Sequence, residues 1–178
     1  MKVVIDVLLA TILLALLLPF LLVVALLISM ADFKSPLFIQ KRVGLHKLSF
    51  KIVKFRTMNK GEITFIGKVL RKTGIDELPQ LLNIIFMEMS FVGPRPLTQN
   101  DIERLEWTSD YYNQRWNVKP GIVGLAQLAP ICHKKMSWFL DRYYIKHNNL
   151  LLDGRIFCSS LLIPFVGKAK VKSWMHKK

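Results

Sequence analysis

The sequence predicts an α+β protein, in which a small mixed domain of helices and short strands follows an N-terminal membrane helix. Residues 7–30 are almost wholly apolar. After them, short stretches of alternating apolar and polar residues are interleaved with helical patterns and with turns that contain Gly and Pro. We therefore expect a membrane segment over residues 1–33 and one domain over residues 34–178 that ends in a basic tail.

The apolar segment is long enough to cross a membrane, because a straight helix rises about 1.5 Å per residue against a hydrocarbon core of roughly 30 Å. A cleaved signal peptide is disfavoured, since the apolar run is too long and Asp6 interrupts its basic flank. Pro19 removes a backbone donor, so we expect a break or kink there. Lys2 and Lys34 place positive charge at both ends. Residue-level reasoning therefore leaves a re-entrant hairpin and a spanning helix both open.

Composition narrows the class of ligand. The 178 residues carry a formal net charge of +14, which attracts nucleic acid, anionic lipid or phosphorylated small molecules. Hydrophobic residues make up 52% of the chain and the mean hydropathy is +0.31, which favours membrane association. Cys132 and Cys158 lack a CxxC spacing and are expected to be reduced thiols. Cys132 and His133 lack the further ligands that a zinc site needs.

Two strands, a linker and a short helix are predicted after the membrane segment. Residues 37–44 and 49–58 are expected to pair as strands around a turn at residues 44–47, with basic side chains on a solvated face. Residues 59–67 are expected to be a polar linker. A short helix should then end at Gly74.

The next helix carries two adjacent acids, Asp76 and Glu77. Pro79 is tolerated only in a first turn, so the helix should start near residues 75–78 with both acids at its N-terminus. An apolar stripe at helical spacing then follows. Its members are Leu78, Leu81, Leu82 and Ile85.

Acids at a helix N-terminus are usually caps that contribute about 0.3–1 kcal/mol, and this interpretation comes first. Arg71 precedes the pair, however, and Arg95 follows it on a rigid Gly-Pro-Arg-Pro turn. An acid at this position is expected to stay ionised. An ionised Asp76 can attack phosphorus, and Glu77 can hold Mg²⁺ with Asp76 beside it.

The remaining chain shows a strand before the turn at Arg95, a helix over residues 101–106, a turn-rich stretch over residues 119–131 and two further helical patterns. Aromatic residues beside Lys and Arg are typical of helices in the lipid headgroup region. For Trp107, Trp116 and Trp138, core packing is an equal alternative, whereas Trp174 favours the interface.

Taken in order, these motifs resemble the bacterial sugar transferase family, the monotopic phosphoglycosyl transferases, in their short single-domain form. The matching stretches are the apolar N-terminus with its proline, FIQKRVG, FKIVKFRTM, IDELPQLLNI, MSFVGPRPL, VKPGIVGLAQ and DRYYIKHNNLLLD. They run to about Asp153 and so cover nearly the whole chain. KFRTM, DELPQLLN and SFVGPRP together form a specific signal.

The resemblance implies an enzyme on the cytosolic face of the bacterial inner membrane, anchored by a re-entrant helix that breaks at Pro19 and flanked by interfacial amphipathic helices. It would transfer a sugar 1-phosphate from a UDP-sugar to polyprenyl phosphate and release UMP, as the first membrane step of glycoconjugate assembly. Asp76 would be the nucleophile and would form a phosphosugar intermediate, and Glu77 would be associated with Mg²⁺.

The resemblance also implies partners and further site residues. Arg71, Arg95, Arg56 and Lys119 match positions with expected phosphate or nucleotide contacts. Inner-membrane lipids and downstream glycosyltransferases would be partners, and nucleic acid would not.

The chain departs from the family pattern at Leu18, where a serine is usual, and in a shorter linker after Met58. Leu125 stands in place of a tryptophan, and residues 129–131 in place of Asn-Gly-Arg. These departures leave the sugar open. The alternative class is a non-catalytic, membrane-anchored basic protein that binds anionic lipid or nucleic acid.

Overall fold

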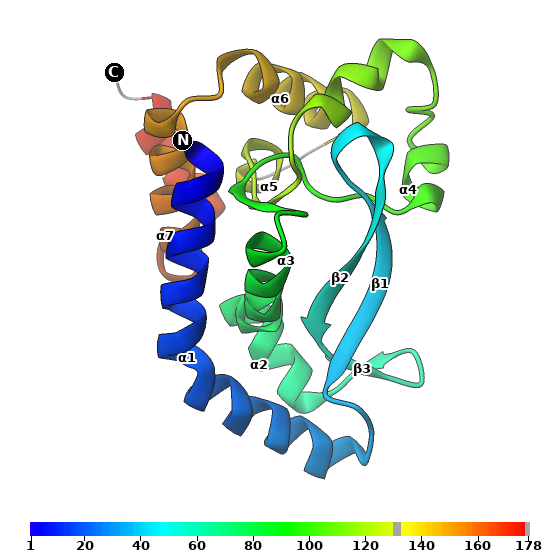
Figure 1. The fold of residues 1–178 in the computed structure, drawn as a ribbon, viewed down its shortest axis with the longest axis vertical. Helices are drawn as coiled ribbons and strands as arrows, with labels where there is room; N and C mark the ends of the chain where they lie inside the picture. Colours follow the sequence, from blue (N-terminus) through cyan, green and yellow to red (C-terminus); the bar gives the residue numbers. More distant parts are fainter. Residues whose placement is uncertain (130–132, 177–178) are drawn as a thin grey trace. The chain divides into compact units, whose positions relative to one another are not determined.

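The computed structural model describes residues 1–129 and 133–176, and it divides into two compact units. Unit 1 comprises Met1–Lys41 and Lys51–Met87, and unit 2 comprises Arg42–Phe50 and Glu88–Lys178. Helices and short strands occur together in the chain, as the α+β prediction requires (Figure 1). The expected boundary at residue 33 concerns membrane topology and stays a prediction.

Unit 1 begins with helix α1, Lys2–Asp32, which contains Pro19 and is not interrupted there. Figure 1 shows that the axis of α1 changes direction part-way along, as a proline inside a helix is expected to cause. Pro19 therefore lies in a bent helix and not between two separate ones. By length and composition, α1 is the one helix among the described residues that is able to cross a membrane.

The predicted strand pair is present as β1, Leu37–Val43, and β2, Ser49–Phe55, joined by the 3₁₀ turn η1, Leu45–Lys47. The expected polar linker instead contains a small antiparallel hairpin of β3, Met58–Asn59, and β4, Glu62–Ile63. Its two-residue turn is built on positive φ angles at Lys60 and Gly61, a conformation that closes a tight hairpin.

The short helix predicted to end at Gly74 is α2, Phe65–Thr73. The hydroxyl oxygen of Thr64 caps its start by accepting a hydrogen bond from the Gly67 N–H at 3.0 Å. Gly74 follows with a φ of +75°, the left-handed conformation that ends helices at low cost when the residue is glycine.

The helix carrying the acids starts where predicted, but its first part is the 3₁₀ helix η2, Ile75–Gln80, before α3, Leu81–Ile85. A 3₁₀ helix has about 3.0 residues per turn instead of 3.6, so the predicted apolar stripe shifts. Among the aliphatic side chains of α3, Leu81 and Ile84 are buried, whereas Leu82 and Ile85 are only partly buried.

Helix α1 supplies much of the apolar support beneath these acids. Ile75 and Leu78 of η2 pack against the buried cluster that Leu21, Val24 and Ile28 of α1 form with residues of β2 and α2. The second half of the apolar helix is therefore part of the core of unit 1 as well as a candidate anchor.

Unit 2 contains two short parallel strands, β5 and β6, and, among its described residues, five helical segments besides η1. The strands are Ser90–Val92 and Gly121–Val123. The helical segments are α4, Gln99–Arg104; η3, Asp110–Asn117; α5, Leu125–Leu128; α6, Lys134–His147; and α7, Leu150–His176. The helix predicted over residues 101–106 is thus present and starts earlier, because Thr98 and Asp101 form a capping box.

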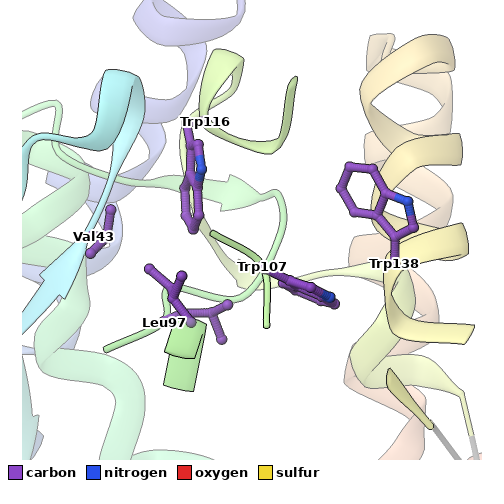
Figure 2. Close-up of a cluster of buried hydrophobic side chains, with 6 residues drawn as sticks. Val43, Leu97, Trp107, Trp116 and Trp138 are labelled. Carbon is purple, nitrogen blue, oxygen red and sulfur yellow. The ribbon is translucent and has the colours of Figure 1, made fainter. Parts of the chain in front are cut away.

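Three tryptophans of unit 2 are core residues. Trp107, Trp116 and Trp138 are buried in one cluster with Val43, Leu97 and Ile102 (Figure 2). The interfacial interpretation of these three side chains is therefore wrong. Nothing is described for the side chain of Trp174, and Pro130, Ile131 and Cys132 lie outside the described residues.

Candidate functional site

The two acids lie in the first turn of η2, directly after Gly74. The backbone N–H of Glu77 donates to the Gly74 carbonyl at 3.1 Å, which closes the turn and places both carboxylates at the tip of the helix. Both side chains are partly buried.

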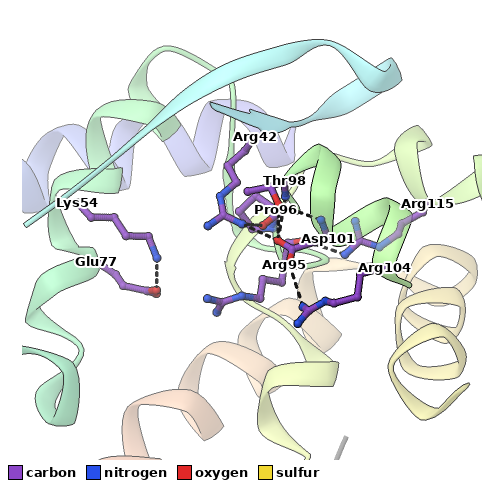
Figure 3. Close-up of polar contacts among 9 residues, drawn as sticks. All are labelled: Arg42, Lys54, Glu77, Arg95, Pro96, Thr98, Asp101, Arg104 and Arg115. Carbon is purple, nitrogen blue, oxygen red and sulfur yellow. Dashed lines mark hydrogen bonds and ion pairs between the residues drawn. The ribbon is translucent and has the colours of Figure 1, made fainter. Parts of the chain in front are cut away.

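Glu77 is paired with a lysine that sequence analysis did not select. Lys54 Nζ of β2 donates to Glu77 Oε1 at 2.6 Å, and the two side chains are only 16% and 24% exposed (Figure 3). The sequence predicts a solvated strand face for the basic residues of β2. Lys54, however, lies on the same strand face as Phe50 and Ile52, both of which are buried, and this alternation is the pattern that indicates a partly buried lysine.

The Asp76 carboxylate forms no ion pair with a described residue. Burial and then the negative charge of Glu77 raise its pKa, and Lys54 and Arg71 oppose the shift. The expectation that Asp76 stays ionised remains a prediction. Burial opposes the favourable effect of the helix N-terminus, and η2 is only a short 3₁₀ helix.

Two of the predicted arginines also belong to unit 1, and their contacts differ. Arg71 donates from Nε to Thr57 Oγ1 at 2.8 Å, and its charge acts on Asp76. Arg56 instead donates from Nε to the Ser35 carbonyl at 2.7 Å and from Nη2 to the Leu37 carbonyl at 3.4 Å. Arg56 therefore fastens the start of β1 to β2, and its predicted phosphate contact gains no support from this geometry.

Arg95 and Lys119 belong to two loops of unit 2 that are in backbone contact. Gly93 lies so close to the Lys119 carbonyl oxygen that an added Cβ would be 2.4 Å from it. The Gly121 N–H donates to the Pro94 carbonyl at 3.0 Å. The Arg95 side chain is exposed and forms no hydrogen bond or ion pair with a described residue (Figure 3).

A model of the family described as bacterial sugar transferase matches residues 1–167. The chain belongs to this family. The resemblance seen in the sequence is thereby confirmed over nearly the whole length of this bacterial sugar transferase.

Named relatives agree with the family. The chain is 34% identical to the UDP-N-acetylgalactosamine-undecaprenyl-phosphate N-acetylgalactosaminephosphotransferase of Aeromonas hydrophila, over 91% of this chain and 43% of that protein. It is 32% identical to the UDP-glucose:undecaprenyl-phosphate glucose-1-phosphate transferase of Klebsiella pneumoniae, over 92% of this chain and 40% of that protein. This sugar transferase thus spans about two fifths of the length of both.

A relative of more similar length is the exopolysaccharide production protein ExoY of Sinorhizobium fredii. It is 32% identical over 83% of this chain and 78% of that protein. The names of these relatives place them among transferases and proteins of exopolysaccharide production.

The donor atoms of this sugar transferase can supply part of the coordination shell of a magnesium ion. Among the described residues, no group of three or more His, Cys, Asp or Glu side chains is placed to hold a metal. Asp76 and Glu77 do offer hard oxygen atoms, and one oxygen of Glu77 already accepts from Lys54. This set fits Mg²⁺, which usually binds one or two carboxylates and completes its shell with water and substrate phosphates.

Proposed function

We propose that this chain transfers a sugar 1-phosphate from a UDP-sugar to polyprenyl phosphate, with Asp76 as the covalent nucleophile and UMP as the product released. The observation that carries the proposal is the Asp76 carboxylate, which is partly buried, without an ion-pair partner among the described residues, and flanked by Lys54 and Arg71. Family membership and the names of the relatives support the reaction class over a non-catalytic basic protein.

The first step forms a bond between an Asp76 carboxylate oxygen and the phosphorus that carries the sugar. The bond from that phosphorus to the bridging oxygen breaks, and UMP leaves with the oxygen and the electron pair. In the second step an oxygen of polyprenyl phosphate attacks the same phosphorus and frees the carboxylate. The product is a polyprenyl-diphosphate-linked sugar, and neither step requires an oxidant or a net proton.

The residues around Asp76 suit this chemistry. A raised pKa makes the ionised carboxylate a more basic oxygen nucleophile. Lys54 and Arg71 supply positive charge near the carboxylate, where negative charge from the diphosphate would otherwise accumulate. Asp76 and Glu77 would hold Mg²⁺, which would neutralise part of the diphosphate charge when bound.

Intact-mass measurement tests the covalent step. After incubation of the full chain with UDP-sugars and Mg²⁺ but without polyprenyl phosphate, we expect a mass increase of one phosphosugar, located at Asp76 by peptide analysis. Polyprenyl phosphate should then remove the adduct. A panel of UDP-sugars that leaves the mass unchanged, while UMP is released in a complete reaction, would contradict the covalent route.

Glu77→Gln tests the proposed metal role. We expect the Mg²⁺ concentration for half-maximal turnover to rise about ten- to a hundredfold, because one charged oxygen ligand is lost. Calorimetric Mg²⁺ binding in the presence of UDP should weaken in parallel. Glu62→Gln is the matched control, since Glu62 is exposed on β4. An unchanged metal titration in Glu77→Gln would remove Glu77 from the proposed site.

Location at the cytosolic face of the inner membrane is part of the proposal. Helix α2 exposes Phe65 and Val69 beside Lys68 and Lys72, a pattern that suits an interfacial amphipathic helix on anionic lipid. The bend in α1 suits a re-entrant anchor. Downstream glycosyltransferases would consume the lipid-linked sugar.

Labelling of sealed vesicles tests the re-entrant anchor. A membrane-impermeant amine reagent should modify Lys2 and Lys34 from the same side, because a hairpin returns both flanks to one face. Exposed Lys146 of α6 reports the side of the catalytic domain. Labelling of Lys2 and Lys34 from opposite sides would show a spanning helix.

A further inference from the structure

The backbone of the Gly-Pro-Arg-Pro turn in unit 2 is held almost entirely by groups outside the turn. Prolines have no N–H, so this segment can make few hydrogen bonds of its own. Four successive carbonyls each accept a hydrogen bond from elsewhere. Their donors are the Gly121 N–H to Pro94 at 3.0 Å, Arg115 Nη2 to Arg95 at 2.7 Å, Arg42 Nη1 to Pro96 at 3.2 Å and the Val43 N–H to Leu97 at 2.9 Å.

Arg115 is the most deeply buried charged group among these donors. Its side chain, on η3, is 3% exposed. Nε donates to Asp141 Oδ2 of α6 at 2.9 Å, and the Asp141 side chain is also 3% exposed. The guanidinium lies 5.4 Å from the ring centre of Trp107 and 5.1 Å from that of Trp116. Two of the three guanidinium nitrogens of Arg115 therefore donate hydrogen bonds and two tryptophan rings lie beside its central carbon, which together restrict its orientation.

Stability alone is a weak reason for such a pair. Burial lowers the pKa of Arg115 and raises the pKa of Asp141, so both charges are disfavoured by loss of water. Replacing a buried ion pair with well-packed apolar residues is often neutral or stabilising. What the guanidinium supplies, and an apolar residue does not, is a rigid fork that donates to a carboxylate and a carbonyl at once.

The carbonyl held by Arg115 belongs to Arg95, whose own side chain points away from Arg115 into solvent (Figure 3). Arg95 precedes a proline, which confines its backbone to extended conformations. The peptide that joins Arg95 to Pro96 can still rotate as a plane. The hydrogen bond from Arg115 to its carbonyl restricts that rotation.

We propose that Arg115, held by Asp141, is a positioning residue that fixes the Arg95 peptide so that the Arg95 guanidinium meets the substrate diphosphate in one orientation. This inference rests on the phosphate-binding role proposed for Arg95. Pre-organisation of that kind has a large effect on rate, because a displacement of about 1 Å at a binding group can change rates by about a hundredfold.

Arg115→Lys in the full chain tests the proposal. Lysine keeps the charge opposite Asp141 but offers a point donor in place of the fork. We expect hydrogen exchange at the Gly121 and Val43 amides, which donate to the Pro94 and Leu97 carbonyls on either side, to become at least about tenfold faster, because the turn opens more often. UDP affinity should fall about ten- to a hundredfold. Asp141→Asn should show the same changes to a smaller extent. Arg104→Lys is the matched control, since Arg104 is 77% exposed and should change neither readout.

A double-mutant cycle separates positioning from a general structural effect. In an Arg95→Ala background, Arg115→Lys should no longer weaken UDP binding. An undiminished loss in that background, or unchanged exchange at the Gly121 and Val43 amides in Arg115→Lys, would overturn the inference. Should Arg95→Ala by itself leave UDP affinity unchanged, the phosphate role of Arg95 fails, and hydrogen exchange alone then determines whether Arg115 positions the turn.

Discussion

Asp76→Asn is expected to lower turnover by at least about a thousandfold and, at neutral pH, to raise the melting temperature of the protein. The loss of turnover follows because the amide cannot form the phosphosugar bond that the proposed route requires. The gain in stability follows because burial and Glu77 both disfavour the ionised carboxylate, and asparagine removes that charge at nearly constant shape.

The gain should depend on pH in a defined direction. A raised pKa in the folded protein means that, between the ordinary value of about 4 and the raised value, the folded state binds more protons than the unfolded state. The contribution of Asp76 to the free energy of unfolding is therefore full below the ordinary value and is lost as pH rises through the raised one. The difference in melting temperature between Asp76→Asn and wild type should be small near pH 4 and largest above the raised pKa.

Asp110→Asn is the control for this comparison, because Asp110 is exposed at the start of η3 in unit 2. It should leave turnover unchanged. Thermal melts of the detergent-solubilised full chain and a UMP-release assay measure the two effects. An Asp76→Asn protein that is less stable than wild type at all pH values would show that the carboxylate supports the fold, and a variant that still turns over would exclude it as the nucleophile.

Gly121→Ala is expected to destabilise unit 2 by more than about 4 kcal/mol, enough to prevent normal folding. An added Cβ would lie 2.1 Å from the Gly93 nitrogen and 2.6 Å from the Val92 carbonyl carbon. Both are backbone atoms of the strand and turn beside Gly121, and they cannot move away without breaking the β5–β6 pairing and the hydrogen bond from the Gly121 N–H to Pro94. Because the same contact supports the Arg95 and Lys119 loops, both would lose their geometry.

Gly154→Ala is the matched control for Gly121→Ala. Gly154 is exposed in α7, and an added Cβ would meet no atom within 4 Å. Alanine should be neutral or stabilise the helix by up to about 1 kcal/mol, since it has the higher helix propensity. Circular dichroism and yield of folded protein compare the two variants. A Gly121→Ala protein with a melting temperature like that of wild type would show that the strand pair has room to separate.

Several local elements of this sugar transferase could be predicted because their signals are short-range. The strand pair β1–β2 follows from alternation around a turn, and the end of α2 follows from Gly74. The start of the segment that carries Asp76 and Glu77 follows from Pro79, which restricts the backbone within one turn. In each case the deciding interaction lies within a few residues of the signal.

The environment of the acids could not be read in the same way. Lys54 and Glu77 are 23 residues apart, and their ion pair exists because β2 and η2 belong to one packed unit. The pKa of Asp76 depends on how much water the surrounding side chains remove, which the residues next to it in the chain do not report. Arg56 carries the right charge for phosphate, but the nearby Ser35 and Leu37 carbonyls take its donors.

The order of residues was enough to establish the family, the apolar helix and the position of the acidic pair, because motif spacing and hydrophobic length are properties of the chain. Packing alone established which cation neutralises Glu77, that three tryptophans form a core, and that Arg115 holds the Arg95 carbonyl. The physical reason is range: backbone preferences act between neighbours, whereas burial and charge pairing depend on segments that meet only when the chain has folded.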